Sequence, residues 1–277
     1  MSPPADVPDG LVDVHVHLGP SDSGEVYYPD LAAAELADVA AVAGVTASCA
    51  FPPYQVGGYA GANAEVLAAG RGSGGTVLPF ARLGGRRPAF CRTPRPWQLR
   101  RAARRGLLGV PPDLPGAPGA PDGLPAYAGV KLLPHLDGLP DAETFAVLRE
   151  LRLPVVVHGG EHVPPAWVER RLLPLLGRCP VVLAHLGVFP LAEPLLADAL
   201  ALVRRRPGVV LDTSGVWSSV LVARAVRAAP DQVVFGSDAP LTHPAVAWQH
   251  VAESVRDDGL LERVGAVNPA RVLAGAL

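Results

Sequence analysis

Five side chains of this sequence combine residue types and positions that suit metal chemistry. They are His15, His17, His158, His185 and Asp238. Each lies at the end of a short apolar segment, and imidazole and carboxylate groups are good ligands for zinc and other divalent transition metals. A single buried histidine is more often a hydrogen-bonded core residue than a ligand. Four histidines at three segment ends, with an aspartate at a fourth, are difficult to explain by packing alone, so the set predicts a metal site.

The rarity of lysine in this sequence indicates a sixth candidate for the active site. Of the 24 basic residues 23 are arginine, and Lys131 is the one lysine in the sequence. Because arginine serves at every other basic position, a solvent-facing role for Lys131 is disfavoured. Guanidinium cannot replace an amine that must lose its proton and react, or a compact point charge in a tight pocket. We therefore expect Lys131 in the active site.

The elements that must position these side chains form a repeating pattern. Eight apolar runs alternate with alanine- and leucine-rich stretches, and such continuous runs are typical of parallel strands buried on both faces. The runs span 11–17, 45–50, 77–82, 129–133, 154–158, 181–185, 208–213 and 232–238. Eight strand–helix units predict an α/β fold, a (β/α)8 TIM barrel forming a single domain over 10–277, a size that 277 residues suit.

The stretches between the strands carry helix signals. Asp30 can cap a helix over 31–43 that Gly44 ends, and Asp141 can cap a helix over 142–152. Later helices are predicted over 165–177, 191–206, 218–229, 244–258 and 269–276.

Strand alternation predicts where the histidines of the first strand point. His15 and His17 are two residues apart, so both face into the barrel, with Asp13 one layer deeper. The candidate ligands end their strands, and the carboxyl ends of the strands form the face on which such barrels build their active sites.

The connection after the third strand is unusually long and forms an insertion at about 84–127. Its first half is rich in arginine, and 109–126 is rich in proline and glycine. We interpret 96–107 as a helix. Two interpretations stay open: a surface insertion, or a lid over the barrel mouth that attracts an anionic substrate.

The motifs resemble those of the amidohydrolase superfamily, in particular its amidohydrolase-related branch of small TIM-barrel metal enzymes. The matching pieces are DVHVH at 13–17, GVKLLP at 129–134, VVVHGG at 155–160, VLAHLG at 182–187, FGSDAP at 235–240 and NPARVL at 268–273. The metal ligands that the resemblance implies are His15, His17, His158 and Asp238. It further implies that His185 is either a ligand of a second metal or a general acid/base. Asp238 would accept a proton from the attacking water.

The resemblance leaves Lys131 two roles. In some members of the superfamily a lysine on this strand is carboxylated and bridges two metals; the alternative is direct contact with a substrate or ligand. The expected cofactor is a divalent metal, with zinc favoured, as one ion or as two if Lys131 is carboxylated.

The resulting hypothesis is a metal-dependent hydrolase of an amide, lactone or ester bond in a small anionic molecule. The alternative is a decarboxylase of a small aromatic or unsaturated acid, which the same branch contains. Such decarboxylases typically use one metal and lack the bridging lysine, so Lys131 favours the hydrolase. A non-catalytic barrel is disfavoured because the ligand set is intact.

Six further side chains are candidates for substrate binding. They are Tyr54, Arg82, His135, His162, Trp217 and His243. Arg82 ends the third strand and could bind a carboxylate or phosphate through a bidentate contact, or could pair with a neighbouring loop. The histidines could instead cap backbone groups, and the aromatic side chains could be ordinary packing. Asp212 and Ser214 are expected to orient a metal ligand. Asn268 and Arg271 are expected to have structural roles.

Composition narrows the classes of partner. The net charge of −2 does not indicate nucleic acid, and proline and glycine interrupt the uncharged stretch 39–64, so no membrane span is expected. Three cysteines are too few for a disulfide framework and are typical of reduced thiols, which favours a cytoplasmic protein. The expected partner is a small-molecule substrate, and a homodimer is a further hypothesis.

Overall fold

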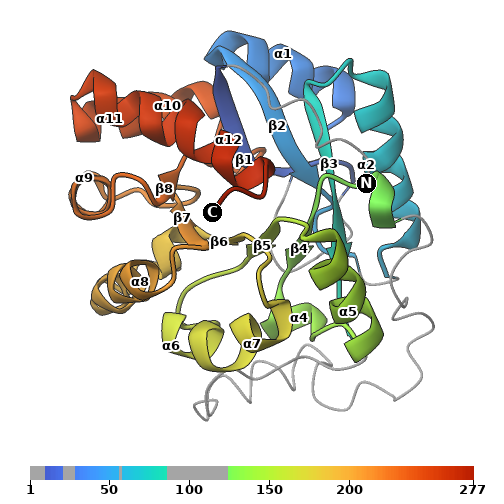
Figure 1. Ribbon diagram of the computed structural model, residues 1–277. Helices are drawn as coiled ribbons and strands as arrows, with labels where there is room; N and C mark the ends of the chain where they lie inside the picture. The colour runs from blue at the N-terminus through green and yellow to red at the C-terminus, as the bar shows by residue number, and fades with distance from the viewer. Residues whose placement is uncertain (1–9, 21–28, 56–57, 86–123) are drawn as a thin grey trace, which may run out of the picture.

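The computed structural model describes residues 10–20, 29–55, 58–85 and 124–277, which form a barrel of parallel strands alternating with helices (Figure 1). The eight strands follow one another around the barrel in chain order. They are β1 Leu11–His17, β2 Val45–Phe51, β3 Val77–Leu83, β4 Gly129–Leu132, β5 Val155–Val157, β6 Val181–Leu183, β7 Val209–Asp212 and β8 Val233–Val234. The predicted single-domain (β/α)8 TIM barrel is confirmed.

Backbone hydrogen bonds between β1 and the segment after β8 bring the two ends of the sheet together. The Asp238 N–H donates to the His15 carbonyl at 2.9 Å, and the His17 N–H donates to the Ala239 carbonyl at 2.7 Å. Three of these four residues are candidate metal ligands. The contact between the first and last strands therefore also brings the candidate ligands together.

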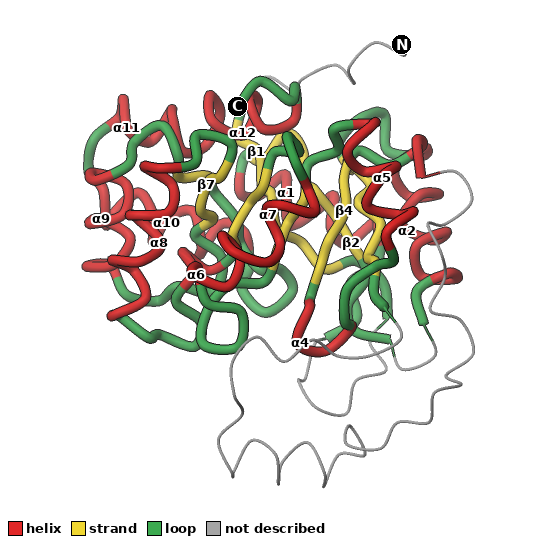
Figure 2. Tube along the Cα trace, turned by 60° about the horizontal axis from the view of Figure 1, so that its bottom comes forward, coloured by secondary structure: helices red, strands yellow, loops and turns green. Residues whose placement is uncertain are grey.

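Helices cover the outside of the strands (Figure 2). They are α1 Ala33–Ala43, α2 Ala60–Gly72, α4 Pro134–Asp137, α5 Ala142–Leu151, α6 Pro165–Trp167, α7 Leu173–Leu176, α8 Pro194–Arg205, α9 Ser219–Ala228, α10 Pro244–Val255, α11 Asp258–Glu262 and α12 Asn268–Leu273. Short π-helical stretches, Val168–Leu172 and Arg263–Val267, join α6 to α7 and α11 to α12. Among these helices, within the described ranges, none is long and apolar enough to cross a membrane.

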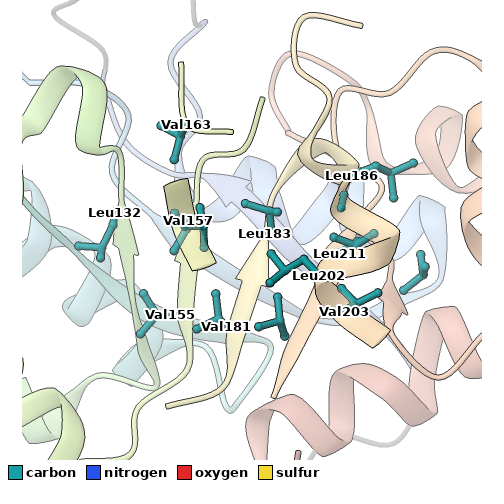
Figure 3. Close-up of a cluster of buried hydrophobic side chains, with 14 of the residues drawn as sticks. Leu132, Val155, Val157, Val163, Val181, Leu183, Leu186, Leu202, Val203 and Leu211 are labelled. Carbon is teal, nitrogen blue, oxygen red and sulfur yellow. The ribbon is translucent and has the colours of Figure 1, made fainter. Parts of the chain in front are cut away.

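Successive residues of the strands pack on opposite sides of the barrel wall. The outer cluster includes Val155, Val157, Val181, Leu183 and Leu211, with Leu202 and Val203 of α8 packed among them (Figure 3). The intervening residues Val156, Val182, Val210 and Val234 belong to a separate cluster. Val156 and Val210 lie two residues before His158 and Asp212, on the same side of their strands. The barrel interior is thus filled by apolar side chains beneath the candidate site.

Two predicted helix ends are confirmed and one is wrong. Gly44 ends α1 in the left-handed conformation with φ 70°, and the Asp141 carboxylate accepts a hydrogen bond from the Thr144 N–H at the start of α5. Asp30 does not cap α1. The helix begins after Ala32, which takes the N-cap position, so Asp30 lies two residues before the cap.

The sequence analysis did not predict α2. Its glycines lower the helix propensity of the segment, and Gly70 has a packing reason: a Cβ there would lie 2.8 Å from the Pro79 ring of β3. The predicted helix over 96–107 and most of the long connection lie outside the described residues.

Candidate functional site

Three candidate ligands converge at the carboxyl end of the barrel. His15 Nε2 and His17 Nε2 lie 3.5 Å and 3.3 Å from Asp238 Oδ1. Ligand atoms of the three residues all fall within 4.8 Å of one another, and the side chains are buried. Two imidazole nitrogens and a carboxylate oxygen at this spacing are a donor set for a divalent metal.

The charge states of these groups also fit a metal, which requires neutral imidazole and ionised carboxylate. Burial lowers the pKa of His17 to about 3, although the nearby Asp238 carboxylate acts in the opposite sense. Burial would raise the pKa of Asp238, but the neighbouring histidines, His17 first, outweigh it and hold that pKa well below its ordinary value. A lone pair on His17 and a negative charge on Asp238 are therefore both available at neutral pH.

Asp212 orients His15. Its Oδ2 lies 2.9 Å from His15 Nδ1. Burial would raise the pKa of Asp212, but the interaction with His15 lowers it to about 2, so the carboxylate is ionised and can only accept a hydrogen bond. The proton of His15 therefore resides on Nδ1, and the lone pair of Nε2 faces Asp238. Ser214, whose Oγ lies 3.0 Å from the same Nδ1, belongs to this arrangement. The expected orienting role of Asp212 and Ser214 agrees with this geometry.

Asp13 fixes the backbone under the ligands. Its Oδ1 accepts hydrogen bonds from the His15 N–H at 3.1 Å and the Ser237 N–H at 2.9 Å. Asp238 itself has a φ of 64°, in the left-handed region that costs a residue other than glycine on the order of 1–3 kcal/mol. The hydrogen bonds that Asp13 accepts from β1 and from the segment after β8 hold the chain where this conformation is required.

Lys131 lies inside the site, as the sequence predicted, rather than in solvent. The side chain is 1% exposed, and its Nζ lies 3.1 Å from His15 Nε2 and 4.6 Å from the centre of the Phe51 ring. Burial lowers the pKa of Lys131 to about 7, against the opposing charges of Asp212 and Asp238. Burial therefore favours the unprotonated amine, the form that can react with carbon dioxide.

His158 and His185 form a pair beside the triad. His185 Nε2 lies 3.2 Å from His158 Nδ1, and His185 Nδ1 lies 2.9 Å from the Ser214 carbonyl oxygen. Burial lowers the pKa of His185 to about 4 and holds that of His158 well below its ordinary value. In the compact ligand groups of the described residues, His185 occurs with His15 and Asp212, whereas His158 occurs in neither group. A role for His158 as a ligand stays a prediction.

A wall of aromatic rings extends from this pair. His135 lies between His158 and His162, with ring centroids 4.7 Å and 5.0 Å apart, and the His162 ring is stacked on it at 19°. Phe189 packs against His158 at 5.2 Å and is 38% exposed. His135 lies against His158, and His162 lies one ring further out; the substrate contacts predicted for both from the sequence stay predictions. The sequence analysis missed Phe189, because a single aromatic residue in a loop carries no periodic signal.

The Arg82 guanidinium forms an ion pair within the protein. The side chain is 1% exposed, and its Nε donates to Asp137 Oδ2 at 2.9 Å. The Tyr59 hydroxyl donates to the other oxygen of Asp137 at 2.8 Å, and the Tyr59 ring lies 4.8 Å from the guanidinium. Of the two alternatives open for Arg82, the structure shows the ion pair, with a carboxylate that α4 supplies; a substrate contact stays a prediction.

The remaining predicted contacts lie further from the triad. Tyr54 lies over the Arg82 guanidinium at 5.8 Å. Trp217 is 62% exposed and lines a cavity of about 120 Å³ against α10, to which none of the triad residues contributes. His243 caps α10, where its Nδ1 accepts from the Ala245 N–H at 3.1 Å. For Tyr54, Trp217 and His243, substrate binding stays a prediction.

Asn268 and Arg271 hold α12 against the start of β8, at the end of the barrel opposite the site. Asn268 Nδ2 donates to the Pro230 and Val233 carbonyls, each at 2.8 Å. Arg271 donates to the Asp231 carbonyl at 3.4 Å. These contacts agree with the structural role expected for both residues.

Comparison with known proteins places the whole chain in one group. A sequence model of the family described as amidohydrolase matches residues 12–274. No curated protein sequence matches the chain. Among solved structures, a probable 2-pyrone-4,6-dicarboxylic acid hydrolase from Acinetobacter baumannii, with citric acid bound, is 17% identical with a TM-score of 0.63, covering 95% of this chain and 99% of that one. A 2,6-dihydroxybenzoate decarboxylase from Rhizobium is 13% identical with a TM-score of 0.58, covering 96% and 98%. A dihydroorotase is 18% identical with a TM-score of 0.59, covering 96% and 69%. At these identities the structural likeness shows the shared fold.

Proposed function

Since this chain belongs to the amidohydrolase family, we propose that it is a metal-dependent hydrolase that cleaves an amide, lactone or ester bond in a small anionic molecule. The observation that carries the proposal is the position of Lys131, buried with its Nζ 3.1 Å from a nitrogen of the ligand triad. A 2-pyrone-4,6-dicarboxylic acid hydrolase among the structural neighbours supports an anionic substrate. The arginine-rich sequence that follows β3 also supports it.

His15, His17 and Asp238 would hold the metal, for which we favour zinc because of the mixed nitrogen and oxygen donors. An ammonium at the Lys131 position would repel a cation held by this triad. Carboxylation of the neutral amine would replace that repulsion with an anionic oxygen ligand able to bridge a second metal, for which His185 and His158 are candidates. When bound, the metal supplies Lewis acidity that activates water and polarises the scissile carbonyl.

The protein's own groups would move the protons. Asp238 lies against both histidines of β1 and is ionised, so it can accept a proton from the attacking water. His185 and His158 are uncharged and share a 3.2 Å contact, so this pair can pass a proton from the triad toward His135 at the mouth.

A second candidate function is decarboxylation of a small aromatic acid. The observation that favours it is the wall formed by His135, His158, His162 and Phe189, which suits a planar ring. A 2,6-dihydroxybenzoate decarboxylase and a 5-carboxyvanillate decarboxylase also share the fold. Under this candidate Lys131 stays an amine that contacts the substrate, and one metal suffices.

Three measurements on purified protein test the proposal. Metal content by mass spectrometry and a carbamate signal in ¹³C NMR after incubation with ¹³C-bicarbonate report the state of Lys131. Hydrolysis of 2-pyrone-4,6-dicarboxylate and related anionic lactones and amides is measured in parallel with carbon dioxide release from 2,6-dihydroxybenzoate. We expect a carbamate, at least one metal and hydrolysis. Loss of activity in Lys131→Ala with partial rescue by acetate or propionate would support the carbamate.

Two outcomes would contradict the proposal. Absence of a bound divalent metal, together with full activity of His15→Ala, would remove the metal-dependent mechanism. A bare amine at Lys131 with release of carbon dioxide would transfer the assignment to the decarboxylase.

A further inference from the structure

A second cavity lies at the opposite end of the barrel from the metal ligands. It has a volume of about 550 Å³ and is lined by the first residues of β6 and β7, Val181 and Val209, and by the turns that precede them. Leu277 also lines it, and Figure 2 places this end of the chain on the side of the barrel away from α4, which follows the carboxyl end of β4. Because the candidate active site lies at the carboxyl ends of the strands, this cavity is separate from it.

The cavity concentrates positive charge on a protein whose net charge is −2. Its charged side chains are Arg152, Glu169, Arg178, Arg205 and Arg206. Four arginines and one glutamate give these side chains a net charge of +3. The cavity is therefore strongly basic although the whole chain is slightly acidic.

The five charged groups divide into a fixed set and a free set. Glu169 accepts two hydrogen bonds from Arg205, at 2.7 Å and 3.2 Å, and pairs with Arg206 at 3.5 Å. Hydrogen bonds from Arg205 lower the pKa of Glu169, so it stays ionised and holds both arginines. Among the described residues, Arg152 and Arg178 have no ion-pair partner. Arg152 and Arg178 thus line the cavity outside the ion pairs formed by the described residues.

We propose that this cavity binds a small polyanion that carries two or more phosphate or carboxylate groups. Guanidinium groups bind both groups through paired N–H donors and stay charged at every physiological pH. The volume falls in the range of roughly 300–1,000 Å³ that small-molecule sites occupy. Glu169 fixes Arg205 and Arg206 in place, so their remaining positive charge is held near the cavity. The ligand would be held by Arg152 and Arg178, with Arg205 and Arg206 adding charge at the rim.

The site touches the elements that position the candidate active site. β7 begins at the cavity with Val209 and ends at Asp212, which hydrogen-bonds His15. β6 begins there with Val181 and leads to His185. The proposal nevertheless stands independently of the proposed function, because its test measures binding and not turnover.

Calorimetric titration of the full chain with inorganic pyrophosphate and with citrate, at low salt, tests the proposal. The test variant is Arg152→Gln with Arg178→Gln. The matched control is Arg170→Gln with Arg204→Gln. Both arginines are exposed, one in the Val168–Leu172 stretch and the other in α8, and neither lines the cavity. We expect the wild type to bind at least one of the two anions. The affinity of the test variant for that anion should be at least tenfold lower, and the affinity of the control should stay within twofold of the wild type. Preference for pyrophosphate or for citrate distinguishes a phosphate ligand from a carboxylate ligand.

A chemical measurement on the unaltered protein provides an independent result. Phenylglyoxal modifies accessible arginines, and mass spectrometry locates the products. We expect the bound anion to protect Arg152 and Arg178 while Arg170 and Arg204 react as before. Equal affinities of test and control variants, equal protection of all four arginines, or no binding of either anion by the wild type would each overturn the proposal.

Discussion

Replacing Asp212 with asparagine isolates the effect of one carboxylate on the metal ligands. One oxygen of Asp212 accepts from the His185 N–H at 2.8 Å, the Ser214 N–H at 3.0 Å and the Ser214 hydroxyl. The other oxygen lies 2.9 Å from His15 Nδ1. The asparagine carbonyl must face the three donors, so its NH2 group faces His15. Nδ1 then has to accept, and the proton of His15 moves to Nε2, the nitrogen that the metal requires.

The size of the effect follows from the bonds that change. A hydrogen bond to a charged group contributes about 1.5–3 kcal/mol. Loss of a partner that orients a metal-binding histidine typically lowers metal affinity about 10–100-fold. We therefore expect Asp212→Asn to bind zinc about 10–100-fold more weakly, equivalent to about 1.4–2.7 kcal/mol. The fold should remain intact because the three bonds at the other oxygen are kept.

Competition with a fluorescent zinc chelator measures the affinity, and long-range ¹H–¹⁵N NMR reports which nitrogen of His15 carries the proton. Asp258→Asn is the control, since it removes the same charge from an exposed position. Wild-type zinc affinity in Asp212→Asn would refute the reasoning. So would a wild-type proton position on His15 accompanied by weaker binding, because the loss would then have another cause.

Three further perturbations have defined outcomes. Burial lowers the pKa of His135 from 6.5 to about 3, so the unfolded chain takes up a proton before the folded chain as the pH falls. The free energy of unfolding of the metal-free protein should therefore decrease below about pH 6.5. Chemical denaturation should show that this free energy falls less steeply in His135→Gln, by about 1.4 kcal/mol per pH unit. Gly236→Ala places a Cβ 2.9 Å from His15 Cβ, so it should lower the free energy of unfolding by about 1–3 kcal/mol and also weaken zinc binding. Gly208→Ala is the control: its Cβ would meet nothing within 4 Å, so neither quantity should change in the same two assays. Asn268→Ala removes one buried and one part-buried hydrogen bond, each of 2.8 Å, and should lower the free energy of unfolding by about 1–3 kcal/mol while leaving zinc affinity unchanged. A drop in zinc affinity would contradict the structural role of Asn268.

The barrel and the convergence of His15, His17 and Asp238 could be predicted because their signals are local. A parallel strand buried on both faces is a continuous apolar run, so all eight strands were visible in the sequence. The two-residue spacing of His15 and His17 places both side chains on one face, and the structure brings them to Asp238. Lys131 was identified by its rarity, and its position beside His15 agrees with that inference.

The remaining features depend on contacts between residues distant in sequence. Arg82 ends a strand like the ligands do, and nothing near it in sequence indicates that Asp137, 55 residues later, pairs with it. The glycines of α2 argue against a helix locally, although Gly70 is needed where the helix crosses Pro79. His158 ends its strand like the other ligands, yet its partner at 3.2 Å is His185 and not the triad.

The carboxylate of Asp13 gives the order of synthesis a consequence for metal loading. It accepts hydrogen bonds from the N–H groups of His15 and Ser237, and Ser237 lies 224 positions after Asp13 along the chain. A nascent chain from which β8 and the following segment have not yet emerged carries the paired histidines but neither Ser237 nor Asp238. It therefore offers an ion only part of the triad, on a strand whose backbone is not yet fixed. High-affinity metal capture by the candidate triad would therefore wait until Asp238 has been synthesised, so the ion would be selected by the folded barrel.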